Sequence, residues 1–239
     1  HLQIAKALMG VEIEQNLLFD VTLHAATVLS TIVVLWSEVA RLLRGLFSRR
    51  FNEEQAYVLK LLLSMIPIGI VGFTLKDRLD ALLESPAILL VVGCMLLVTA
   101  ALLAFAYYAK PRQKAQLSYR DAFLIGVAQA VAALPGLSRS GSTIATGLLL
   151  GNRKQTVAQF SFLMVLAPIL GETFLELMKG NLGAQAIGSA PLAAGFVAAF
   201  VVGCLACKFM IEIVKRGKLV WFALYCAAAG TVSILSYVL

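Results

Sequence analysis

Charged residues are scarce in this 239-residue chain. Asp, Glu, Lys and Arg make up only 14% of it, whereas 60% is hydrophobic and the mean hydropathy is +0.89. Soluble domains carry about 25% charged residues, so this composition excludes a soluble globular protein. Several apolar runs reach about 20 residues, the length that crosses a bilayer as an α-helix. Alternating segments of about ten residues, typical of membrane barrels, are missing. The sequence therefore predicts an all-α, polytopic helical membrane protein.

Cysteine and histidine are also rare. All four cysteines fall in apolar segments, at Cys94, Cys204, Cys207 and Cys226. The Cys204-x-x-Cys207 pair has no histidines and no second pair near it, so we interpret it as packing, not as a metal site or a disulfide. The histidines are His1 and His24. A histidine acting as general base would have to be one of these two.

Six apolar segments are long enough to cross a membrane: 19–43, 57–75, 86–108, 157–178, 191–213 and 219–239. Two more, 122–134 and 142–150, are too short to cross alone and flank a polar motif. We expect these two to form a re-entrant helical hairpin over about residues 122–151. Non-helical backbone at membrane depth is tolerated only where it is buried in protein or lines a wet cavity.

The net charge of +7 comes mostly from short loops. Basic residues cluster after the first and third spans, after the hairpin and before the last span, while the other loops hold only Lys76, Arg78 and Lys179. The positive-inside bias puts the basic loops in the cytoplasm, so the hairpin enters from and returns to that side. Because this charge pattern is a topology signal, we exclude nucleic acid as a partner.

The chain also carries a faint internal repeat. A shift of 141 residues aligns Gly10 with Gly151 and Phe19 with Phe160, and the two copies would have opposite orientation. We expect one membrane domain over 1–239, with 1–108 the remainder of a first repeat and 119–239 the second repeat that holds the hairpin. The sequence starts at His1, so we expect a first polar break upstream and a first hairpin that is truncated here.

The most informative segment is Leu134-Pro-Gly-Leu-Ser-Arg-Ser-Gly-Ser-Thr143, between the two short apolar segments. An arginine at bilayer depth costs at least about 2.5 kcal/mol, so Arg139 there indicates a functional site. Pro135 and Gly136 interrupt the helix, and the hydroxyls that follow can cap a new one. A helix that begins inside the membrane directs N–H groups and a positive dipole end at an anion. The alternative is a polar loop with Arg139 at the headgroups.

A family resemblance rests on these residues and their neighbours. The strings Tyr119-Arg-Asp-Ala-Phe-Leu-Ile-Gly-Val-Ala-Gln129, the polar segment itself and Phe160-Ser-Phe-Leu163 resemble the second signature of the bacterial undecaprenyl-diphosphate phosphatases of the bacitracin-resistance type. The resemblance implies inverted repeats with two re-entrant hairpins. It also implies hydrolysis of the lipid carrier diphosphate to the monophosphate outside the cytoplasmic membrane, for peptidoglycan synthesis, with bacitracin resistance when enzyme is abundant. Of the family's first signature, only the final histidine would remain, as His1.

On this basis we expect three catalytic residues. Arg139 would grip phosphate oxygens through its guanidinium fork, and His1 would be the base by resemblance. For the nucleophile we expect a serine of the first signature, upstream of His1, with Ser138 as the weaker candidate. We expect the remaining site residues to bind substrate: Gly136, Ser140, Gly141, Ser142, Thr143 and Gln129. The N–H groups of Gly141–Thr143 are expected to hold the oxyanion.

The resemblance also implies a divalent cation, Mg²⁺ or Ca²⁺, although no metal ligands can be named. It implies a polyprenyl diphosphate lipid as substrate and a multi-pass position in the bacterial inner membrane with the active site open to the periplasm. A homodimer is a further expectation, which no sequence feature decides. A lipid-carrier flippase or transporter remains the alternative, because inverted repeats and broken helices also build transporters. Two histidines and no Pro-Ser-Gly-His string argue against the acid-phosphatase type of lipid phosphatase.

Overall fold

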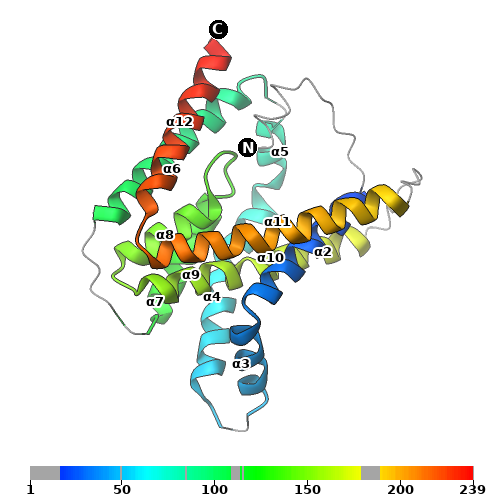
Figure 1. Cartoon of the computed structure of the whole chain (residues 1–239), viewed down its shortest axis with the longest axis vertical. Coiled ribbons are helices and arrows are strands. Elements are labelled where there is room, and N and C mark those ends of the chain that lie inside the picture. Colours follow the sequence, from blue (N-terminus) through cyan, green and yellow to red (C-terminus); the bar gives the residue numbers. More distant parts are fainter. Residues whose placement is uncertain are drawn as a thin grey trace.

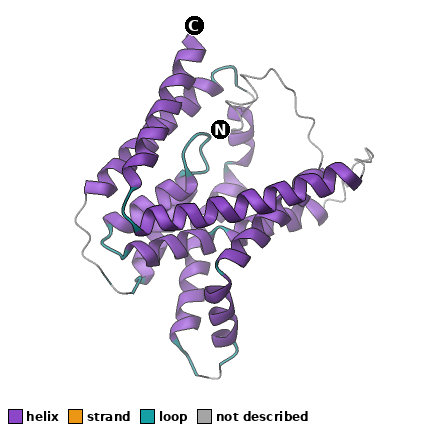
Figure 2. Cartoon of the chain, in the orientation of Figure 1, coloured by secondary structure: helices purple, strands orange, loops and turns teal. Residues whose placement is uncertain are grey.

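The protein is mainly helical in the part that its computed structural model describes, which comprises residues 17–48, 50–83, 85–108, 114, 116–178 and 189–238. Helices α2 to α12 follow one another through this part, and no strand occurs in it (Figures 1 and 2). The one β-type pairing among these residues is an isolated bridge between Lys114 and Asn152. The all-α prediction is confirmed.

Four helices are long and apolar enough to span a membrane. They are α4 (Glu53–Thr74), α6 (Ile88–Tyr108), α11 (Ser189–Lys215) and α12 (Leu219–Val238), and a bent pair of helices would make a fifth span. A short helix, α5 (Lys76–Leu83), follows α4. The prediction of a multi-pass helical membrane protein is therefore confirmed.

The first predicted span, 19–43, is not straight. It breaks at Leu35 into α2 (Leu17–Val34) and α3 (Trp36–Leu46), which are bent by 85°. Before the break, the hydroxyls of Ser30 and Thr31 both donate to the carbonyl of Thr27, a back-bonding that bends helices. After it, α3 carries Glu38 and two arginines, which favour water over lipid. The segment expected to cross is therefore a bent pair of helices, which makes one span only if the two helices cross together.

The predicted span at 157–178 is also broken, at Val165. It forms α9 (Lys154–Met164) and α10 (Leu166–Met178). Pro168 lies in the first turn of α10, where its ring excludes a bond to the carbonyl four residues earlier, that of Met164. Met164 is the last residue of α9, so the proline explains where the helix ends. The segment expected to be long enough to cross thus consists of two shorter helices, and neither is among the candidate spans of the described residues.

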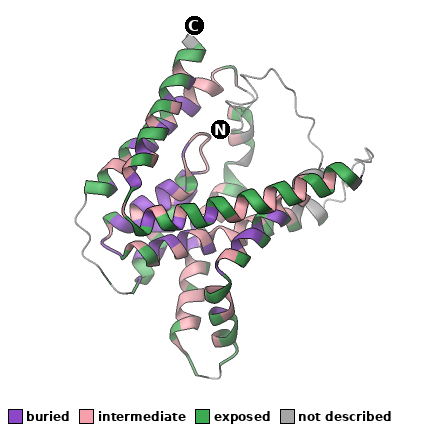
Figure 3. Ribbon diagram, viewed as in Figure 1, coloured by how far each residue is buried: buried purple, intermediate pink, exposed green. Residues whose placement is uncertain are grey.

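Small residues bring the helices together in pairs. In the pair formed by α6 and α12, a Cβ at Gly93 would lie 2.9 Å from the carbonyl oxygen of Gly230. Helix α11 crosses α2 with Gly203 against Ser30 (Figure 1). Buried residues gather along α7, α8 and α9, while the outer faces of α11 and α12 are exposed (Figure 3). The exposed side chains there include Leu205 and Trp221, as expected of a surface that faces lipid.

Candidate active site

Two short helices in the middle of the molecule carry the polar motif. They are α7 (Tyr119–Val131) and α8 (Arg139–Leu149), joined by the loop 132–138 (Figure 1). They pack against each other, α7 also packs on α4, and α8 also packs on α6. A Cβ at Gly126 would collide with the backbone of Ser64, so this glycine permits the close approach of α7 to α4. This is the arrangement that a helical hairpin requires.

The tip of the hairpin lies against α6. Gly136 has a φ of +91°, and a Cβ on it would lie 2.5 Å from the carbonyl oxygen of Val92. The backbone N–H of Ser138 donates to Oγ1 of Thr99 over 3.1 Å. Thr99 lies about 16 Å along the axis of α6 from its first residue, which is near the middle of a spanning helix. This contact favours a tip at membrane depth over a loop at the headgroups.

Ser138 is the N-cap of α8. Its Oγ accepts the N–H of Gly141 over 3.2 Å, and its carbonyl oxygen accepts the N–H of Ser142 over 2.8 Å. These two N–H groups are therefore not available to an anion in this structure, contrary to the cradle expected from Gly141–Thr143. The N–H of Ser140 has no acceptor among the described residues, so this first-turn N–H is available to donate to an anion. The Thr143 hydroxyl donates to the carbonyls of Arg139 and Ser140, so it faces its own helix.

Burial differs sharply within the motif. Arg139 is exposed and Ser140 is half-buried, whereas Gly141, Ser142 and Thr143 are buried. Gln129 is fully buried, and neither atom of its side-chain amide has a hydrogen-bond partner among the described residues; the same holds for Oγ of Ser142. An unsatisfied buried polar group costs about 1–3 kcal/mol. These two side chains are therefore poised to accept a partner.

The register of the hairpin brings Gln129 to the level of the motif. Asp121 on α7 contacts Asn152 just after α8, and Ile125 lies beside Gly147. Both helices advance by the same rise per residue, so one turn further along α7 the antiparallel register puts Gln129 at the height of Thr143. Ser142 is its neighbour in sequence. Two orphaned polar groups that the sequence assigned to the site thus lie at one height of the hairpin.

His1 falls outside the described residues, so its predicted role as base stays a prediction. A cavity of about 420 Å³ is lined by residues of α3, α4 and α9, among them Glu38, Lys60 and Gln159. Gln116 and Leu117, which precede α7, also line it, so this cavity lies at the base of the hairpin and not at its tip.

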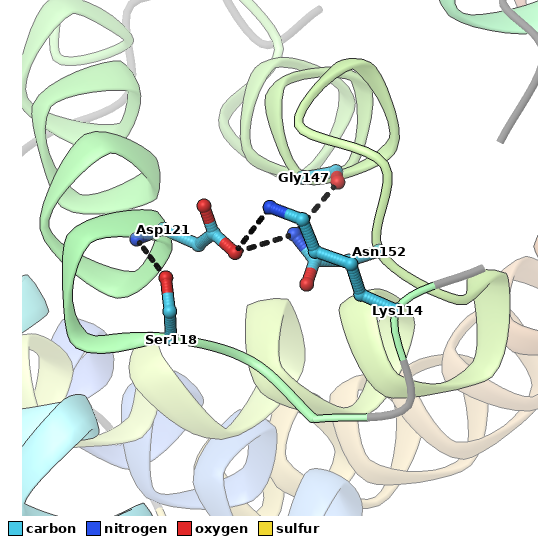
Figure 4. A network of polar contacts seen from close by, with 5 residues as sticks. All are labelled: Lys114, Ser118, Asp121, Gly147 and Asn152. Carbon is cyan, nitrogen blue, oxygen red and sulfur yellow. Dashed lines mark hydrogen bonds and ion pairs between the residues drawn. The ribbon is translucent and has the colours of Figure 1, made fainter. Parts of the chain in front are cut away.

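Sequence reasoning missed Thr99, which comes from another helix 39 residues before Ser138. It also missed the polar network at the base of the hairpin, outside the spanning helices, where Lys114, Ser118, Asp121 and Asn152 meet (Figure 4). Burial raises the pKa of Asp121, but hydrogen bonds from Ser118, Lys114 and Asn152 and the charge of Lys114 outweigh it, so the pKa is lowered overall. The carboxylate is thus kept ionised although it is buried.

The donors at the tip suit an anion better than a cation. Hydroxyls, an amide and a guanidinium surround the first turn of α8, whereas Mg²⁺ and Ca²⁺ are held by carboxylates and carbonyl oxygens. The part of the chain that the structure describes contains no group of three or more His, Cys, Asp or Glu able to hold a metal ion. The residues at the tip do not fit a divalent cation, so no chemical step is derived through one.

Comparison with known proteins identifies the family. The profile described as bacitracin resistance protein BacA matches residues 1–232. The chain belongs to the BacA family. A BacA relative named undecaprenyl-diphosphatase from Parabacteroides distasonis is 61% identical over 98% of this chain and 88% of its own length. One of the same name from Bacteroides fragilis is 60% identical over 98% and 88%. One from Methanosphaera stadtmanae is 31% identical over 98% and 89%. The resemblance to this family is thereby confirmed.

Proposed function

We propose that this protein hydrolyses undecaprenyl diphosphate to undecaprenyl phosphate in the membrane, and so returns the lipid carrier to peptidoglycan synthesis and confers bacitracin resistance. Membership of the BacA family and the name that its relatives share support this activity. The observation that carries the chemistry is the interrupted hairpin, which brings Arg139 and the first turn of α8 next to the middle of α6. When a lipid diphosphate binds at such a site, its charged phosphates lie beside these groups and its hydrocarbon chain stays in the bilayer.

In the proposed reaction, a water oxygen adds to the terminal phosphorus and the bond from that phosphorus to the bridging oxygen breaks. Inorganic phosphate and the lipid monophosphate are the products. Arg139 neutralises the terminal phosphate with its fork of N–H groups, and the Ser140 N–H and hydroxyl donate to the charge that develops. His1 acts as the base. In this direct reaction Ser138 holds the turn in place through its cap and its bond to Thr99. In a two-step alternative the Ser138 Oγ attacks the terminal phosphorus as the bond to the bridging oxygen breaks and the lipid monophosphate leaves, and water then cleaves the Oγ–P bond to release inorganic phosphate.

The proposal includes the inner membrane as the location, with the site open to the periplasm. Helix α6 runs from the weakly basic connection 76–85, which contains α5, to the strongly basic loop after it, so its first turns lie on the outer side. The hairpin tip contacts Val92, in the second turn of α6. The tip therefore reaches the outer half of the bilayer from a cytoplasmic base. A homodimer belongs to the same proposal, and so does the divalent cation that the family resemblance implies, carried by the oxygens of the diphosphate itself because the residues at the tip do not fit one.

The test uses the full chain in sealed vesicles that contain undecaprenyl diphosphate. Phosphate release and movement of the lipid between leaflets are measured in the same vesicles. We expect phosphate release that ceases when the lipid in the accessible leaflet is consumed. Translocation without phosphate release would contradict the proposal and favour the flippase.

Gln129→Leu separates a binding role from a structural one. Leucine fits the volume of the buried amide and removes two unsatisfied polar atoms, so we expect an unchanged or higher melting temperature. Loss of the amide should raise KM about tenfold, which corresponds to about 1.4 kcal/mol of binding. Ser161→Ala removes another buried, unpartnered hydroxyl outside the hairpin and serves as the control, with KM unchanged. A lower melting temperature with an unaltered KM would refute the assignment.

A further inference from the structure

The base of the hairpin is held by a network that the proposed chemistry does not use. The chain that enters the hairpin and the chain that leaves it form a backbone bridge, in which the N–H of Lys114 donates to the carbonyl of Gly151 over 3.0 Å. Asn152 is fully buried beside this bridge. Its side-chain Nδ2 donates to Oδ2 of Asp121 over 3.3 Å and to the carbonyl of Gly147 over 3.2 Å (Figure 4). One amide thus ties the end of α8 to the start of α7.

Asp121 completes the tie from the other helix. It is 3% exposed, and its own N–H is held by the N-cap Ser118 over 3.0 Å. Lys114 lies 3.3 Å from the same carboxylate oxygen that Asn152 contacts. A buried carboxylate is stable only when it is paired and hydrogen-bonded, and here it has both kinds of partner. The network therefore fixes the two ends of the hairpin relative to each other.

We propose that Asp121 and Asn152 are positioning residues, which set the place of α8 from its base and thereby the place of Arg139 and Ser140 at its tip. The link is mechanical. Helix α8 has 11 residues, so it is a rod of about 16 Å that transmits a shift at one end to the other. Its tip is held on one side by the contacts of Ser138 and Gly136 with α6, and the Asp121–Asn152 contact at the other end supplies the second fixed point.

The proposal rests on the proposed phosphatase activity for its catalytic readout, so the test includes a second readout that needs no activity. The key variant is Asn152→Asp. It replaces the amide donor by a carboxylate that faces Asp121 and the Gly147 carbonyl. The repulsion pushes the start of α7 away from the end of α8. We expect kcat to fall about 100-fold with KM little changed, the scale of a misplacement of about 1 Å. Adding Asp121→Asn removes the repulsion, and we expect the double variant to recover about tenfold.

The matched control is Gln116→Glu. Gln116 Nε2 donates to Glu53 Oε1 over 3.0 Å, an exposed amide–carboxylate contact that precedes the hairpin. The same chemical change there should leave kcat within about twofold, because exposed ion contacts contribute little. The second readout is the rate at which an impermeant thiol reagent modifies Ser140→Cys in a background without native cysteines. Asn152→Asp should change this rate severalfold, and Asp121→Asn should restore it.

The outcomes separate the proposals. If no variant releases phosphate, but the rate of thiol modification at position 140 changes with Asn152→Asp and is restored by Asp121→Asn, the phosphatase proposal fails and the positioning proposal stands. Folded Asn152→Asp protein with the wild-type kcat and thiol rate would overturn the positioning role, as would a Gln116→Glu variant that is equally impaired. If Asn152→Asp does not fold, Asn152→Ala decides: it adds no charge, and we expect a folded protein with kcat lowered about tenfold. A wild-type kcat in that variant would overturn the proposal.

Discussion

Arg139→Ala is expected to reduce phosphate release from undecaprenyl diphosphate by at least about 1,000-fold, the range in which arginines that neutralise a transferring phosphoryl group act. The exposed guanidinium lies at the first residue of α8, where the positive end of the helix also favours an anion. Arg139→Lys should lose most of the activity as well, because an ammonium cannot form two parallel bonds to one phosphate. The measurement is kcat and KM of the purified protein in detergent micelles.

Arg153→Ala is the matched control for Arg139→Ala. Arg153 follows the other end of α8, is exposed and is the N-cap of α9 without a side-chain cap bond. The Arg153→Ala substitution removes the same charge as Arg139→Ala, but at the end of the hairpin that is distant from the tip. We expect turnover within about twofold of wild type, since single exposed charges contribute little. Equal losses in the two variants would mean that net charge, and not the position of Arg139, matters.

Gly136→Ala is expected to destabilise the protein by about 3 kcal/mol, through a left-handed backbone and a Cβ overpacked against Val92. Because this glycine holds the tip against α6, turnover should fall with stability. Gly69→Ala makes the same change in α4, where a Cβ would have no atom within 4 Å. Alanine is the better helix former, so Gly69→Ala should be neutral or stabilise by about 0.5 kcal/mol. Equal melting temperatures for the two variants would contradict the close contact at the tip.

The hairpin could be predicted because its signals are local. Pro135 and Gly136 end the first helix, Ser138 caps the second, and both flanking segments are too short to span. The start of α4 also had a readable signal in Asn52 and Gln55, which form a reciprocal capping box, with Asn52 five residues before the apolar run begins at Tyr57. Where a residue's own neighbours decide its conformation, sequence patterns are sufficient.

The two broken spans differ in how far they could be predicted. Pro168 was a visible reason for a break near Val165, because its ring opposes the helix one turn before it. The bend at Leu35 has no proline or glycine and depends on hydroxyl back-bonding together with the charged face of α3. Both segments were predicted to be long enough to cross because they are apolar over about 20 residues. Hydropathy indicates which residues avoid water, but it does not indicate whether their helix is straight.

The contacts that position the site could not be predicted, because they join distant parts of the chain. Nothing near Thr99 in sequence indicates that its hydroxyl accepts the Ser138 N–H. Asp121 and Asn152 are 31 residues apart and meet only after the hairpin has closed. The internal repeat stays a prediction. A shift of 141 residues carries the end of α4 at Thr74 onto the end of α11 at Lys215.

Whether the first turn of α8 holds the diphosphate is tested by binding of undecaprenyl methylenediphosphonate, in which a CH₂ group replaces the bridging oxygen and prevents hydrolysis. Its affinity is titrated for the wild-type protein, Arg139→Ala and Arg153→Ala under identical conditions. If the first turn of α8 grips the paired phosphates, Arg139→Ala should bind at least about tenfold more weakly, the loss of a charge-assisted contact of about 1.5–3 kcal/mol, while Arg153→Ala binds normally. Wild-type affinity in the Arg139→Ala protein would show that the diphosphate binds elsewhere.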